Sequence, residues 1–254
     1  MKFLLSPAKK MRADEDTLPW QEMPVFWQQA VQLWQILQQR GFAELQALWR
    51  CNEKIAALNH RRLQQLHPAH PVAPALLSYQ GLQYQYLSPQ VFSETELAYA
   101  QANLRILSGL YGVLRPLDGV VPYRLEMQTA LQGGEQRDLY AFWGDAICRQ
   151  LLQEDDTLID LASQEYSRAV LPYLPSGCRC ISCVFAERQH GKLQEKGTYA
   201  KMARGAMARF AAECCAEQPE QLQAFTGFGY LFQPARSDDS RYVFVREQKE
   251  GEDR

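Results

Sequence analysis

The sequence predicts an α+β fold, in which one mixed domain contains all 254 residues. Helical spacings and strand-like apolar runs are interspersed along the chain, without the regular strand-helix alternation of a doubly wound sheet. The chain contains no internal repeat and no long low-complexity linker. Its length is near the upper limit for one hydrophobic core. We therefore expect a single domain over residues 1–254, with a helical N-terminal lobe at about 20–107.

The first half of the chain is predicted to be mainly helical after one short strand. Residues 2–6 form that strand, which ends at a proline. Residues 25–39, 42–50 and 53–66 place apolar side chains at helical spacing. Ser93-Glu94-Thr95-Glu96 has the spacing of a capping box, which predicts a helix over residues 94–107.

The second half mixes strands and helices. Two glycines and a proline interrupt residues 107–118, and a Gln-His-Gly turn at 189–191 predicts a β-hairpin. The elements expected here are, in chain order, a strand-like segment at 122–127, a helix at 138–153, a buried strand at 158–162, the hairpin strands at 179–187 and 192–196, a helix at 198–216 and strands at 228–233 and 241–246.

Composition excludes several classes of protein. Hydrophobic residues make up 46% of the chain and charged residues 22%, which is ordinary for a globular domain and excludes general disorder. The apolar runs are too short to span a bilayer, so no membrane partner is expected. The N-terminus lacks the features of a signal peptide, and seven cysteines are an odd number for a disulfide framework. A cytoplasmic location is therefore expected.

The helix predicted over residues 198–216 separates apolar from basic residues. Lys201, Arg204 and Arg209 share one side, with Gly205 and Ala208 between them, and no acidic residue occurs between 197 and 212. The net charge of the chain is only −2, so affinity for an anion must come from such a local cluster. The pattern is typical of a solvated amphipathic helix, and it also suits a surface that a phosphodiester backbone approaches.

Glycines at 109 and 112 suggest a second anion-binding element. A helix, a glycine turn and a short helix around residues 107–114 would form a helix-hairpin-helix, which holds DNA through backbone amides without reading its sequence. A helix C-cap followed by a tight turn explains the same glycines. The residues alone leave both interpretations open.

Several longer segments resemble the bacterial YaaA family, whose members are called peroxide stress resistance proteins. The resemblance covers essentially the whole chain. It is carried by LSPAK (5–9), LSGLYGVLRPLD (107–118), PYRLEM (122–127), LYAFWGD (139–145), LASQEY (161–166) and AKMARGAMARF (200–210).

The resemblance implies a DNA-binding protein of the oxidative stress response, linked to recombinational repair and to limiting iron-driven damage. It also implies an α+β domain with a basic cleft and a helix-hairpin-helix, the latter in an imperfect form because the two glycines are three positions apart and Pro116 follows. No cofactor is predicted, and DNA is the expected partner. The residues expected to bind DNA are Lys9, Arg105, Ser108, Gly109, Leu110, Tyr111, Gly112, Arg115, Arg124, Lys201, Arg204 and Arg209.

Two other functions remain as alternatives to a non-enzymatic DNA-binding protein. A metal-dependent enzyme acting on nucleic acid would need carboxylates that converge beside a phosphate. The acidic residues within the family-like segments are Asp118, Glu126, Asp145, Asp160 and Glu165. An iron-handling protein would use Cys178, Cys180 and Cys183, but their spacing along a strand suits ordinary core thiols better than a tetrahedral site.

Overall fold

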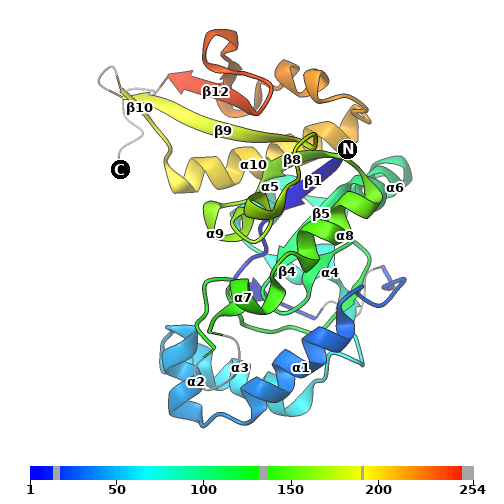
Figure 1. Ribbon diagram of the computed structural model, residues 1–254, viewed down its shortest axis with the longest axis vertical. Coiled ribbons are helices and arrows are strands. Elements are labelled where there is room, and N and C mark those ends of the chain that lie inside the picture. Colours follow the sequence, from blue (N-terminus) through cyan, green and yellow to red (C-terminus); the bar gives the residue numbers. More distant parts are fainter. Residues whose placement is uncertain (14–17, 132–136, 190–191, 248–254) are drawn as a thin grey trace.

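The computed structural model describes residues 1–13, 18–131, 137–189 and 192–247. They form one mixed α/β domain built around a large sheet (Figure 1). In the described residues this sheet has eight strands, ordered β11-β12-β9-β8-β1-β5-β6, with β10 paired to β9. The strands are β1 (Lys2–Leu5), β5 (Leu104–Ser108), β6 (Gly112–Leu114), β8 (Thr157–Leu161), β9 (Arg179–Gln189), β10 (Lys192–Gln194), β11 (Leu231–Phe232) and β12 (Arg241–Glu247).

The sheet is mostly parallel, which differs from the α+β prediction. Parallel pairing joins β12 to β9, β9 to β8, β8 to β1 and β1 to β5. Antiparallel pairing joins β6 to β5, β10 to β9 and β11 to β12. The prediction of a single mixed domain is confirmed. The prediction that the chain lacks strand-helix-strand winding is wrong. The long and irregular segment between β1 and β5 hides that winding in the sequence, because six α-helices and several strands of two small sheets lie among its described residues.

Helices cover the sheet and extend beyond it. They are α1 (Trp27–Gln38), α2 (Phe42–Trp49), α3 (Glu53–Gln65), α4 (Ala75–Ser78), α5 (Leu82–Leu87), α6 (Glu94–Asn103), α7 (Leu139–Trp143), α8 (Ala146–Glu154), α9 (Gln164–Ser167) and α10 (Gly197–Glu213). Helices α1, α2 and α3 lie together at the end of the molecule opposite β12 (Figure 1). The structure also contains two short antiparallel strand pairs outside the large sheet. They are β2 (Lys10–Met11) with β4 (Tyr79–Gln80), and β3 (Ala73–Pro74) with β7 (Gly119–Val120).

The predicted capping box is present at the start of α6. The Ser93 amide donates to Glu96 Oε2 at 2.6 Å, and the Glu96 amide donates to Ser93 Oγ at 3.2 Å. The helix ends at Asn103, four residues earlier than predicted, because Leu104–Ser108 form strand β5 and pair with β1. A fully buried strand lacks apolar-polar alternation, so its sequence resembles a helix continuation.

Two other predicted elements differ in the structure. The helix predicted at 138–153 is divided into α7 and α8 at Gly144, whose φ of +47° favours glycine. Residues 122–127 belong to no strand. The hairpin prediction is confirmed by the antiparallel pairing of β9 and β10, although its turn residues 190–191 lie outside the described residues. None of the helices in the described ranges has the length and apolar character needed to cross a bilayer.

The helix-hairpin-helix prediction for residues 107–114 is wrong. This segment is the antiparallel pair β5–β6, in which Ser108 is paired with Gly112. All residues from Ser108 to Gly112 are buried, and a Cβ at Gly109 would lie 2.4 Å from the carbonyl oxygen of Leu125. The backbone amides of this turn therefore face the protein interior, where they cannot contact a phosphate.

Candidate functional site

A pocket lies where strands β1 and β8 end. The strand order reverses at β1, because β5 pairs on one side of it and the later strand β8 on the other. Parallel sheets commonly bind ligands at the carboxyl ends of such strands. The segments that follow β1 and β8 line a cavity of about 340 Å³ together with α5, α10 and residues 123–126. We call this cavity the central pocket.

Two serines fix the loops that leave the sheet at this edge. The amide of Ser163, which follows β8, donates to Ser6 Oγ at 2.8 Å, and Ser6 Oγ lies 3.2 Å from Ser163 Oγ. The Tyr84 hydroxyl on α5 donates to the Ser6 carbonyl at 2.9 Å. These contacts hold three segments that are distant in sequence around one cavity.

Positive charge exceeds negative charge around the central pocket. Five cations and two carboxylates line it, which are Lys9, Lys10, Arg124, Lys201, Arg204, Glu126 and Glu165. Glu126 accepts from Lys9 at 2.7 Å and from Arg124 at 3.1 Å. Lys10 and Lys201 form no ion pair with the described residues. The pocket therefore retains cationic groups whose charge is not neutralised by the described part of the chain.

Four of the seven basic residues expected from the resemblance to bind DNA line this pocket. Lys9, Arg124, Lys201 and Arg204 converge there, whereas Arg209 does not. Arg209 pairs with Glu213 at 2.6 Å and donates to the carbonyls of Leu87 and Ser88. Five helical positions separate Arg209 from Arg204, a rotation of about 140°, so the two side chains leave α10 in different directions.

Two other arginines predicted to bind DNA are held elsewhere in the protein. Arg105 on β5 is only 4% exposed and its Nε donates to Glu154 at 2.7 Å. Arg115 pairs with Asp118 at 3.0 Å and with Glu22 at 2.6 Å. Neither arginine lines the central pocket. Each of them is paired with carboxylates of the protein, and burial raises the pKa of Asp118 to about 6 against the opposing effect of Arg115.

The small residues of α10 serve protein packing. A Cβ at Gly205 would lie 2.0 Å from the carbonyl oxygen of Gln83, and Ala208 is fully buried. The backbone that approaches this face of α10 is therefore that of α5, contrary to the surface for a phosphodiester inferred from the sequence. This close contact places Gln83 and Arg204 in the same pocket.

Three buried tyrosines line the central pocket, and we call the surface that they form its floor. Tyr84, Tyr123 and Tyr166 line it and are each less than 8% exposed. The Tyr123 hydroxyl lies 2.7 Å from Ser108 Oγ and 2.9 Å from the Tyr79 hydroxyl, and burial raises the pKa of Tyr123 to about 12. These hydroxyls are neutral at physiological pH, so the charge of the pocket belongs to the lysines, arginines and glutamates.

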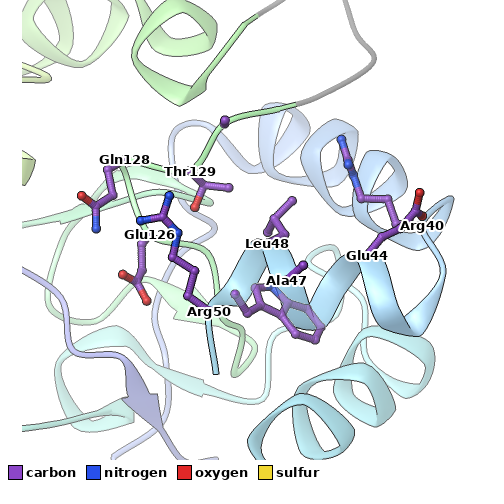
Figure 2. A pocket seen from close by; sticks show the side chains of 10 residues that line it. Arg40, Glu44, Ala47, Leu48, Arg50, Glu126, Gln128 and Thr129 are labelled. Atoms are coloured by element: carbon purple, nitrogen blue, oxygen red, sulfur yellow. The ribbon is translucent and has the colours of Figure 1, made fainter. Parts of the chain in front are cut away.

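A second pocket adjoins the first on the side of α2 (Figure 2). It has a volume of about 310 Å³, and Figure 2 shows side chains of α2 on one side with Glu126, Gln128 and Thr129 on the other. Glu126 lines both pockets. Arg124 donates to Glu126 at 3.1 Å and to the carbonyl of Trp49 at 3.2 Å, so this ion pair lies where the two pockets meet.

Only two of the five candidate carboxylates meet in the central pocket. Glu126 and Glu165 line it, whereas Asp118 and Asp160 are buried and Asp145 pairs with Arg149 on the exposed face of α8. Burial raises the pKa of Glu165 above its ordinary value, and the negative charge of Glu126 adds to this increase against several opposing hydrogen bonds and charges. Glu165 therefore loses its negative charge at a higher pH than an ordinary glutamate does.

The cysteine cluster shows the properties of ordinary thiols. Cys183 is buried, Cys178 and Cys180 are half-buried, and burial raises the pKa of Cys180 to about 12. Cys178 donates to the carbonyl of Asp156 at 3.1 Å. Within the described ranges no three His, Cys, Asp or Glu side chains gather as a metal site would require.

Several pocket residues were not identified from the sequence. Lys10 follows Lys9 within a basic N-terminal segment, so its position beside Lys9 could have indicated that it belongs to the site. Ser6, Gln83 and Ser163 carry no such signal, because polar residues of this kind occur throughout the chain. Only the packing of α5 against α10 and the pairing of β1 with β8 show that they share a cavity.

Comparisons with known proteins agree with the resemblance seen in the sequence. The family model described as "Peroxide stress protein YaaA" matches residues 1–236. A UPF0246 protein of Desulfitobacterium hafniense (strain Y51) is 45% identical over 250 residues, which cover 98% of this chain and 100% of the relative. UPF0246 proteins of Agathobacter rectalis and Lactiplantibacillus plantarum are 44% and 45% identical, covering 97% and 96% of this chain and 99% of each relative. The chain therefore belongs to the peroxide stress protein YaaA family.

Proposed function

We propose that this protein binds DNA through its phosphate backbone at the central pocket, in keeping with a role of its family in the oxidative stress response. The observation that carries the proposal is the convergence of Lys9, Lys10, Arg124, Lys201 and Arg204 around one cavity, in a chain whose net charge is −2. Such a local excess of cations attracts a polyanion even when the whole protein does not. Cytoplasmic location and assistance to DNA repair belong to the same proposal.

The cations of the pocket suit binding that does not depend on sequence. Lys9, Lys10 and Lys201 are exposed at its edge, where flexible ammonium groups contact phosphate oxygens as point charges. Phosphate contacts fix the position of a nucleic acid but carry no base information. We therefore expect similar affinity for duplexes of different sequence and a strong dependence of that affinity on salt.

Removing one cation should reduce the salt dependence by a defined amount. For Lys201→Ala we expect the slope of log K against log salt to become shallower by about 0.9, because one fewer counterion is released per complex. Fluorescence anisotropy with labelled duplex DNA at four salt concentrations measures this slope. Arg149→Ala is the matched control, because Arg149 is 70% exposed on α8 and does not line the central pocket. An unchanged slope for Lys201→Ala, or an equal change in both variants, would contradict the proposal.

Acidification should strengthen DNA binding through Glu165. The folded-state pKa of this carboxyl is raised, so it loses its negative charge at a higher pH than an ordinary glutamate as the solution is acidified. Its neutralisation removes a repulsion toward phosphate worth about 1 kcal/mol, or roughly fivefold in affinity. We expect affinity to rise as the pH falls from 7 toward 5, and the rise to be smaller in Glu165→Gln. At pH 7, Glu165→Gln should bind DNA more tightly than the parent protein does. The control is Glu217→Gln, because Glu217 is an exposed glutamate outside the pocket and its replacement makes the same change in net charge.

A further inference from the structure

The central pocket contains buried hydrogen-bond donors without partners. Gln83 is 6% exposed, and its Nε2 is buried with no hydrogen-bond partner among the described residues. The Nε of Arg204 is also buried and has no hydrogen-bond partner among the described residues. Buried polar atoms are nearly always satisfied, and an unsatisfied donor in a cavity calls for an acceptor supplied from outside. Both donors belong to residues that line the central pocket.

Other groups on the floor of the pocket already have hydrogen-bond partners or are apolar. The hydroxyls of Tyr84 and Tyr123 have partners within the protein, and Leu125 contributes an apolar side chain. With a volume of about 340 Å³, the cavity falls within the range of pockets that enclose small organic ligands. An aromatic and apolar floor beside two unpartnered donors suits a flat heterocycle that carries acceptors.

Charge is distributed differently at the edge of the pocket. Lys9, Lys10 and Lys201 are exposed there, whereas Gln83 and the tyrosines are buried below them. A ligand that matches both levels has an aromatic, acceptor-bearing part inside and an anionic part outside. A nucleotide has this division, with its base as the inner part and its phosphate as the outer part.

We propose that the central pocket receives one unstacked nucleotide, with its base on the tyrosine floor within reach of Gln83 and Arg204 and its phosphate among the lysines at the edge. This inference rests on the proposed function and names the form of DNA that the site takes. Each of the four bases has an acceptor for an amide donor, so recognition by Gln83 needs no particular sequence. Taking a base out of a duplex costs free energy, and the cost is smallest for a nucleotide that is already unpaired. The protein is therefore expected to prefer DNA with an unpaired nucleotide.

Bulged duplexes test the inference directly. We expect a duplex with a one-nucleotide bulge to bind roughly tenfold more tightly than the fully paired duplex, and a bulge with an abasic residue to lose most of this preference. Gln83→Met keeps the size of the side chain and removes the donor, so it should reduce the preference for the bulge over the paired duplex to about threefold or less. Gln85→Met on the exposed face of α5 is the matched control, and thermal melting verifies that both variants are folded.

The outcomes separate this inference from the proposed function. Equal affinity for base-containing and abasic bulges would overturn the inference, while salt-dependent binding of paired duplex would leave the proposed function standing. Absence of binding to every DNA at low salt would overturn both. A deoxynucleoside monophosphate titrated alone distinguishes the source of the nucleotide. If it binds the parent protein but not Gln83→Met, and bulges give no preference, the pocket takes free nucleotides and the strand-bound form is wrong.

Discussion

Replacing Gly205 with alanine is expected to lower the free energy of unfolding by about 2–3 kcal/mol, because it overpacks the contact between α5 and α10. The added Cβ would lie 2.0 Å from the carbonyl oxygen of Gln83 and 2.9 Å from its carbonyl carbon. Both atoms are backbone, so no side-chain rotation relieves the clash. The two helices must separate, and this displaces Gln83 and Arg204 from the central pocket. DNA affinity should therefore fall together with stability.

Gly197→Ala provides a matched control for this prediction. Gly197 begins the same helix, and a Cβ there would meet no atom within 4 Å. We expect this variant to be neutral or up to about 1 kcal/mol more stable, because alanine has less conformational freedom to lose on folding. Urea denaturation of the parent protein and both variants measures the difference. Equal stability of Gly205→Ala and the parent protein would show that α5 does not contact α10 as described.

Arg204→Glu is expected to weaken binding of every DNA sequence by at least thirtyfold, which corresponds to about 2 kcal/mol. Arg204 is the least exposed cation on the α10 side of the pocket, with a side chain 15% exposed, so its interaction with a phosphate is screened less than that of a surface lysine. The substitution removes this attraction and introduces repulsion. Anisotropy titrations with two duplexes of unrelated sequence measure the loss, and a loss for only one sequence would contradict backbone recognition.

Arg204→Ala and Arg209→Ala separate the effect of the pocket from that of helix charge. Each variant removes one cation from α10, but only Arg204 lines the central pocket. We expect Arg204→Ala to reduce affinity several-fold and Arg209→Ala to change it little, since Arg209 is engaged by Glu213 and two backbone carbonyls. Melting temperatures must accompany these titrations, because Arg204 also lies 4.0 Å from Glu195. Equal losses in the two alanine variants would indicate a general charge effect.

Local patterns in the sequence predicted elements whose stability depends on nearby residues. The capping box at Ser93 and Glu96 placed the start of α6 correctly, and apolar spacing located α1, α2, α3 and α10. The same reasoning failed for residues 104–114, because buried strands are apolar on both faces and give no period that distinguishes them from a helix. The two glycines there fit a hairpin turn as well as a turn between helices.

The sequence by itself determined the family and most of the cations. It identified Lys9, Arg124, Lys201 and Arg204 within family-like segments, because motif and charge are properties of consecutive residues. Only the tertiary structure decided that these four meet in one pocket, that Arg105, Arg115 and Arg209 do not, and that Gln83 is a buried donor there. The physical reason is that the cavity forms where β1 pairs with β8 and α5 packs on α10, contacts between segments far apart in the chain. Sequence spacing carries information along one element, whereas convergence depends on how separate elements pack.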